Sequence, residues 1–172
     1  MSSNEENRIE DGDATQSGDR HVKYLTFVVG KESFGVPVMK VREIVRVLNI
    51  TPVPNSPTYV KGVVNLRGKI IPILDLRIKL EMGEGVIDKR SCIVVVQLEL
   101  EGGETGLMGL IVDVMEEVVT LDLKEVEKAP DFGTRLSTDY ITGVCKVKGK
   151  VKTLLDIDRT VGMDVLSQGV AA

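Results

Sequence analysis

An internal repeat is the feature that most constrains how this 172-residue chain folds. Residues 59–75 align with residues 140–156 without a gap. An aromatic residue, two glycines, a lysine and a final aspartate coincide in the two segments, namely Tyr59/Tyr140, Gly62/Gly143, Gly68/Gly149, Lys69/Lys150 and Asp75/Asp156. A weaker upstream match places residues 34–38 over 108–112 and residues 43–45 over 117–119. The repeat predicts that the chain builds one small unit twice.

Short apolar runs rich in Val and Ile, separated by Gly, Pro, Asn and charged clusters, predict a mainly β fold. We expect strands at about residues 23–29, 34–38, 44–48, 62–66, 69–74, 91–100, 106–113, 117–121, 141–147 and 150–156. Short helices are expected at residues 39–44, at residues 76–80 with Asp75 as N-cap, and from about Asp158. Residues 123–128 are a weaker helix candidate, because Pro130 follows closely.

The predicted strands are too few in each half for a broad sandwich, and they suit two small curled β-barrels that share an apolar seam. The first barrel is expected at about residues 22–80 and the second at about residues 91–161, with the boundary at residues 81–90. These bounds are approximate, and strands could exchange between the barrels. Residues 162–172 are expected to form a C-terminal tail.

Charge is distributed unevenly along the sequence. Residues 1–21 hold six acidic and two basic residues, while the other 151 residues hold twenty of each. We therefore expect residues 1–21 to be a disordered acidic leader, to which the sequence assigns no function. The balanced body and the absence of Trp argue against nucleic-acid binding. No signal peptide or membrane-spanning run is present, so we expect a cytoplasmic protein.

The sequence offers no set of catalytic residues. It contains neither a P-loop nor a GxGxxG motif, and its one histidine, His21, lies in the leader. Cys92 and Cys145 have no metal-site spacing and are expected to be small buried hydrophobic residues. Asp75 and Asp156 are expected to cap helices, with acid–base chemistry as the alternative. No enzyme activity, cofactor or metal site is therefore predicted.

Two short segments are more typical of a binding surface. Residues 65–68 place Arg67 at a hairpin tip, and residues 41–44 alternate apolar and charged side chains. A solvated turn and a core face are the alternative interpretations. The proline-rich segment at residues 51–57 would fix the geometry between them. Arginine beside apolar residues on a rigid scaffold favours protein–protein contact.

The motifs, taken together and in order, resemble the CheW family of bacterial chemotaxis coupling proteins. The resemblance covers about residues 23–161 and rests on the sequences at residues 24–27, 34–38, 40–44, 54–62, 65–68, 72–77, 109–114 and 136–143. It implies two SH3-like barrels packed together, which agrees with the repeat. One departure is Pro37, which implies that its strand is an edge there or is paired on one side only.

The resemblance implies a non-enzymatic adaptor. Such proteins bridge the cytoplasmic tip of methyl-accepting chemotaxis receptors and the regulatory domain of the histidine kinase CheA, without entering the membrane themselves. Carried over by position, the receptor-facing residues would be Val41, Glu43 and Arg67. The kinase-facing residues would lie around Ile70 and Cys92, which moves Cys92 toward an interface rim.

Two alternatives remain open on the sequence alone. One is a CheW-like adaptor of a related motility pathway, and the other, from a different class, is a small-barrel nucleic-acid-binding protein. The sequence does not indicate which receptors are served, with what affinity, or in what oligomeric array.

Overall fold

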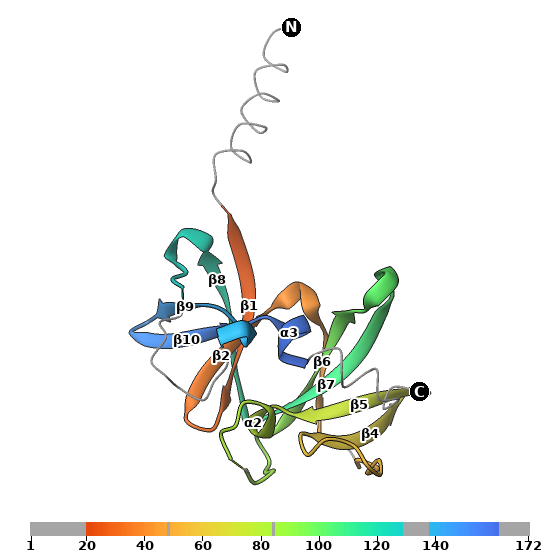
Figure 1. Cartoon of the computed structure of the whole chain (residues 1–172). Coiled ribbons are helices and arrows are strands. Elements are labelled where there is room, and N and C mark those ends of the chain that lie inside the picture. The colour runs from red at the N-terminus through yellow and green to blue at the C-terminus, as the bar shows by residue number, and fades with distance from the viewer. Residues whose placement is uncertain (1–19, 48, 84, 129–137, 162–172) are drawn as a thin grey trace, which may run out of the picture.

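The computed structural model describes residues 20–47, 49–83, 85–128 and 138–161. The expected acidic leader, apart from Arg20 and His21, and the expected C-terminal tail at residues 162–172 lie outside these residues. Within the described residues the fold is mainly β, with ten strands in two five-stranded mixed sheets (Figure 1). The mainly β prediction is confirmed, while closure of the sheets into barrels stays a prediction.

The first sheet has the strand order β8-β1-β2-β10-β9. Its strands are β1 (His21–Val29), β2 (Glu32–Pro37), β8 (Val114–Asp122), β9 (Ile141–Val147) and β10 (Lys150–Leu155). The second sheet has the order β3-β6-β7-β5-β4. Its strands are β3 (Val41–Arg46), β4 (Val60–Leu66), β5 (Lys69–Asp75), β6 (Cys92–Glu99) and β7 (Thr105–Val112). Each sheet thus takes strands from both sides of residues 81–90, so the sheets do not follow the halves of the sequence.

The strand register reproduces the sequence repeat. In the first sheet β2 and β10 run parallel with Gly35 opposite Leu154, and in the second β7 and β5 run parallel with Gly109 opposite Ile73. The other neighbouring strands are antiparallel. The two sheets are therefore two copies of one strand arrangement.

Both copies end in the same kind of hairpin turn. The β4–β5 turn is formed by Arg67 and Gly68, with φ of 52° and 84°, and the β9–β10 turn by Lys148 and Gly149, with φ of 52° and 82°. Two successive residues with positive φ are typical of the type I′ turn, whose twist matches that of the flanking strands. Asn65 Oδ1 accepts a hydrogen bond from Gly68 N at 2.9 Å, which holds the first turn in place.

The predicted helix at residues 39–44 is wrong. A 3₁₀ turn, η1 (Val38–Lys40), is followed directly by β3, which pairs antiparallel with β6. The apolar residues of β3 are β-branched, and pairing with a neighbouring strand outweighs their helix-like spacing. Pro37 pairs with Tyr24 of β1 but lies beyond the residues of β2 that pair with β10, so the one-sided pairing expected there is confirmed.

The other helices are short. Helix α2 (Leu76–Lys79) begins after Asp75, whose Oδ1 accepts a hydrogen bond from Arg77 N at 3.0 Å, as predicted for an N-cap. Helix α3 is Ile157–Val161, and the weaker helix candidate at residues 123–128 is a 3₁₀ turn, η3 (Leu123–Glu125). Two further 3₁₀ turns are η2 (Glu101–Gly103) and η4 (Thr138–Tyr140).

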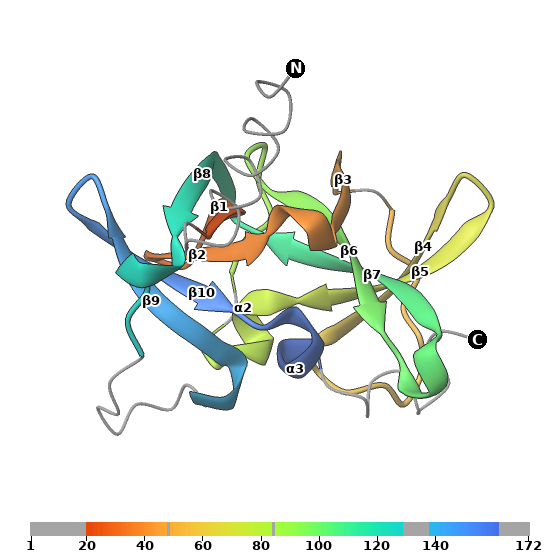
Figure 2. The same ribbon diagram turned by 90° about the horizontal axis from the view of Figure 1, so that it is seen from above.

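The main core lies between the two sheets. It joins residues of both sheets, such as Phe27 and Val96, to residues of α2 and α3, such as Leu76 and Val161. Figure 2 shows α2 and α3 at the junction where the sheets meet. A second core cluster lies on the opposite face of the second sheet, around Ile71 and Ile93. The second sheet therefore has an apolar side chain layer on both faces.

Candidate functional site

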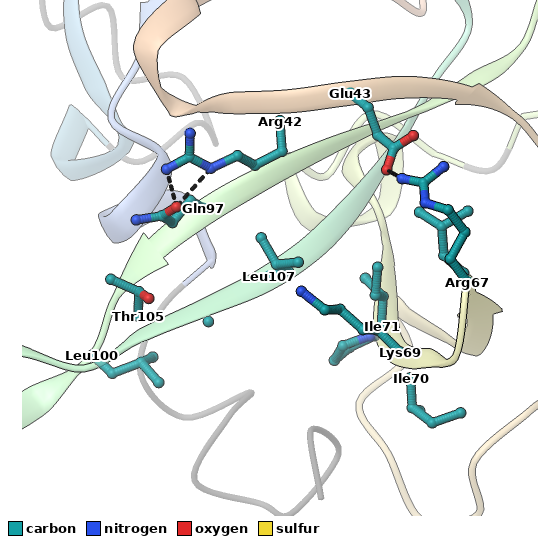
Figure 3. A pocket seen from close by; sticks show the side chains of 13 residues that line it. Arg42, Glu43, Arg67, Lys69, Ile70, Ile71, Gln97, Leu100, Thr105 and Leu107 are labelled. Atoms are coloured by element: carbon teal, nitrogen blue, oxygen red, sulfur yellow. Dashed lines mark hydrogen bonds and ion pairs between the residues drawn. The ribbon is translucent and has the colours of Figure 1, made fainter.

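A groove of about 1130 Å³ opens on the second sheet. Its lining comes from β3, the β4–β5 hairpin, β6 with Leu100 directly after it, and β7. Arg42 and Gln97 lie on one side, Glu43 and Arg67 on another, and the apolar side chains of Leu107 and Ile71 between them (Figure 3). Charged side chains around an apolar floor suit the binding of another protein segment.

Two of the three residues expected to face the receptor meet at this groove. Arg67 forms an ion pair with Glu43, and both line the groove. The side chain of Arg67 is 72% exposed and that of Glu43 is 28% exposed. The type I′ turn projects Arg67 from the hairpin tip toward β3, because Arg67 itself takes the positive φ that the turn requires. Most of the Arg67 side chain is therefore exposed to solvent.

The third residue, Val41, points elsewhere because of a β-bulge. Val41 lies opposite Val96 while Glu43 lies opposite Val95, so Arg42 is the extra residue in β3. The bulge places Val41 against the core between the sheets, where it is half-buried, and turns Glu43 to the other face. Val41 is not among the groove-lining residues, so the structure does not bring it together with Glu43 and Arg67.

The extra residue of the bulge also makes a contact that sequence reasoning missed. Arg42 Nε donates to Gln97 Oε1 at 2.6 Å, and Arg42 Nη2 donates to the same oxygen. The two residues are far apart in the sequence, and the pairing of β3 with β6 brings them together. No sequence pattern marked Gln97, since it stands among apolar residues of a strand expected to be buried.

Ile70 and Cys92 lie at opposite ends of the second sheet. Ile70 lines the groove beside the hairpin tip and is 51% exposed. Strands β5 and β7 run parallel, with Ile73 opposite Gly109, so Ile70 lies at the same height in the sheet as Gly106. Gly106 in turn pairs with Leu98, near the end of β6. Cys92 begins β6 at the other end, about 20 Å away along the strand. Cys92 is 9% exposed, and burial raises the pKa of its thiol.

The residues considered for chemistry have structural roles. Asp75 and Asp156 cap α2 and α3, and their N–H groups donate to Tyr59 O at 2.7 Å and Tyr140 O at 2.8 Å. Cys145 is buried, as expected. No group of three His, Cys, Asp or Glu side chains suited to a metal ion occurs in the part of the chain that the structure describes.

Asp113 ties the two sheets together where the chain passes from β7 to β8. It accepts a hydrogen bond from Gly30 N at 2.6 Å and forms an ion pair with Arg77 of α2. Its side chain is 22% exposed, so it is a largely buried, paired charge.

Comparison with known proteins identifies the family. A model of the CheW-like domain matches residues 23–164. The chemotaxis protein CheW of Klebsiella aerogenes is 33% identical over 145 residues, which cover 84% of each chain. The chemotaxis protein CheW of Rhizobium meliloti is 32% identical over 134 residues, covering 78% of this chain and 83% of the relative.

A solved structure shows the same fold. The scaffolding protein TtCheW from Thermoanaerobacter tengcongensis matches with a TM-score of 0.74 and 29% identity, covering 85% of this chain and 91% of that one. Among the described residues no helix is long and apolar enough to cross a membrane. The chain therefore belongs to the CheW family and is a non-enzymatic adaptor of chemotaxis signalling.

Proposed function

We propose that this adaptor couples the cytoplasmic tip of methyl-accepting chemotaxis receptors to the regulatory domain of the histidine kinase CheA. Its place in the cell would then be at receptor clusters, held there by its partners. The mechanism is one of placement, in which the adaptor joins the two partners and a receptor conformational change shifts the kinase equilibrium. Linkage of this kind requires binding on both sides and no chemical step.

The observation that carries the receptor side is the ion pair of Glu43 and Arg67 at the mouth of the groove. The receptor tip is a helical hairpin, and a helix docks by laying apolar side chains into a groove with polar contacts at its edge. Ile71 and Leu107 supply the apolar floor, and the exposed Arg67 guanidinium supplies donors at the edge. Val41 would contribute by packing behind β3 and holding the bulge.

On the kinase side we propose Ile70 and Cys92. Ile70 offers an exposed aliphatic side chain on the hairpin, of the kind that packs into a partner's apolar surface. Cys92 is buried at the start of β6, so its contribution would come from the shape of that strand end and its neighbours. The two residues mark opposite ends of the second sheet and therefore opposite limits of a kinase contact.

The test is receptor-dependent autophosphorylation of the cognate kinase, measured with and without the adaptor at matched concentrations. We expect a rise that requires all three components. An unchanged kinase rate, together with no binding to either partner, would contradict the proposal and point to an adaptor of a related motility pathway.

A pair of charge reversals tests the receptor site. Arg67→Glu is expected to weaken receptor-tip binding at least tenfold, because it reverses the charge at the groove mouth and leaves it facing Glu43. Lys148→Glu is the matched control, since Lys148 holds the equivalent turn position in the first sheet and also faces a glutamate, Glu117. Equal receptor affinity of the two variants would remove Arg67 from the site.

A further inference from the structure

The groove carries an excess of positive charge. Arg42, Arg67 and Lys69 line it, and Glu43 is the one acidic residue in the lining. Gln97 binds the Arg42 guanidinium without neutralising it, because the amide is uncharged. Arg67 remains 72% exposed beside Glu43. The groove therefore attracts a segment that combines carboxylates with an apolar side chain for the floor.

The equivalent place in the first sheet is not basic in the same way. The repeat sets Glu116 at the position of Arg42, and Glu116 pairs with Lys152 at 3.1 Å. Glu117 pairs with Lys148 at 3.6 Å. With Lys150 at the position of Lys69, three basic residues face two acidic ones there, and one of the three, Lys152, is buried in its pair with Glu116. The groove of the second sheet differs in having three basic residues against a single glutamate, because Arg42 replaces the acidic residue of the first sheet.

A segment of complementary chemistry exists in the same chain. Residues 1–19 contain six acidic residues and one arginine, and they precede the match to the CheW-like domain, which begins at residue 23. Within them Ile9 is followed by Glu10, Asp11 and Asp13. This short stretch offers an aliphatic side chain beside three carboxylates, which is the combination that the groove fits.

The chain connection is short enough for this stretch to reach the groove. From His21 the path runs along β1 to Tyr24, across to its partner Pro37, and on to Arg42. Extended-chain spacing limits this path to about 35 Å, and residues 10–20 can span about the same distance. The tether therefore permits the contact without any change in the described fold.

We propose that the groove binds the acidic stretch of residues 1–19 of the same chain, in competition with the receptor tip. The competition rests on the proposed function, whereas the contact itself does not. Tethering gives the stretch an effective concentration of about 1 mM, so even a weak contact occupies the groove for part of the time. Occupancy would lower the apparent receptor affinity about two- to tenfold at low salt, and screening at high salt would abolish the effect.

The experiment compares the full chain with a full-length variant in which the acidic residues are neutralised by Glu5→Gln, Glu6→Gln, Glu10→Gln, Asp11→Asn, Asp13→Asn and Asp19→Asn. At about 50 mM salt we expect the backbone amide NMR shifts of Gly68, Gln97 and Leu107 to differ between the two proteins. The shift of Gly149, at the equivalent turn of the first sheet, should not differ. The differences at the groove should vanish at about 0.5 M salt.

Receptor-tip titrations of the same two proteins complete the test. The neutralised variant should bind about two- to tenfold more tightly at low salt and equally at high salt. Identical NMR shifts of the groove residues in the two proteins would overturn the proposal. Shift differences that grow with protein concentration would also overturn it, because they would assign the contact to a second copy of the chain. If the NMR shifts of the groove residues differ but neither protein binds the receptor tip, the result would support the contact between the groove and residues 1–19 and contradict the receptor function. Receptor binding of equal strength at low salt would overturn the competition.

Discussion

Glu43 and Glu117 hold the same position in the two sheets, and each pairs with the first residue of a hairpin turn. Glu43 pairs with Arg67, and Glu117 pairs with Lys148 at 3.6 Å. Each glutamate directly follows the extra residue of a β-bulge. The register of β3 against β6 shifts at this bulge, and the register of β8 against β1 shifts at the equivalent position. The scaffold is thus the same twice, and the difference between the sheets lies in the side chains beside these pairs.

The interior of the first sheet is tied by a buried lysine. Lys152 is 3% exposed, and its Nζ donates to Ser33 Oγ at 2.9 Å and to Glu116 Oε1 at 3.1 Å. The repeat places Ile71 of the groove floor at the position of Lys152. The first sheet therefore has a charge network that joins three strands at the position where the second sheet has the buried apolar side chain of Ile71.

Glu116→Ala is expected to destabilise the fold by about 3 kcal/mol, because it leaves the Lys152 ammonium buried without its counter-charge. Lys152→Met should cost less, about 1–2 kcal/mol, since Glu116 is 21% exposed and can be solvated. Urea denaturation measures both. The double variant should lose less free energy of unfolding than the two single variants together. Strictly additive losses would contradict an energetic coupling between Glu116 and Lys152.

The same network predicts a dependence of stability on pH. Burial raises the pKa of Glu116, but the hydrogen bonds from Ser33 and Lys152 and the charges of Lys152 and Lys150 outweigh it and hold this pKa below its usual range. A carboxyl group with a lowered pKa in the folded state stabilises the fold above its unfolded pKa and loses that contribution as pH falls through the folded pKa. The urea midpoints of the wild-type chain and of Glu116→Gln should therefore differ most at neutral pH and converge as the pH falls through the lowered pKa of Glu116. A difference that persists unchanged at acid pH would contradict the assignment.

The sequence predicted the strands well because each one carries its own local signal. Apolar β-branched runs such as residues 92–99 and the turn pairs Arg67-Gly68 and Lys148-Gly149 are sufficient to mark strands and hairpins. The segment at residues 39–44 failed because its short apolar pattern fits a helix and a strand equally, and only pairing with β6 decides between them.

The candidate site was predictable in part for a related reason. Arg67 stands at a turn that the sequence marks, so its exposure and its projection could be foreseen. The separation of Val41 from Glu43 could not, because a bulge is a property of the register between two strands and leaves no trace in one of them. The burial of Cys92 was predictable, because this residue opens an apolar strand, and the structure confirms it.

Exchanging the charges of Glu43 and Arg67 separates structure from recognition. Either single reversal should cost at most about 1 kcal/mol, because the pair is largely exposed and screened by solvent. The double variant Glu43→Arg/Arg67→Glu should recover that stability in urea denaturation, because the pair can form again with opposite polarity. Receptor-tip affinity should stay low, since the partner meets the reversed charge. Recovery of receptor binding by the double variant would instead show that the pair acts only by positioning the hairpin.

Gly62 is the position in the second sheet where a side chain would do the most damage. Its φ is 142°, and a Cβ there would lie 2.9 Å from Pro52 Cα and still closer to the Thr51 carbonyl group. Thr51 pairs with Val63 through hydrogen bonds of 2.9 Å in both directions, so the clash cannot be relieved without breaking this bridge. Gly62→Ala is therefore expected to destabilise the fold by more than about 3 kcal/mol.

Gly68→Ala is the control, because its φ of 84° is also positive but nothing lies within 4 Å of the added Cβ. That variant should cost about 1–2 kcal/mol from backbone strain alone. Urea denaturation of both variants measures the difference, and equal losses would show that the contact with Thr51 does not constrain the strand.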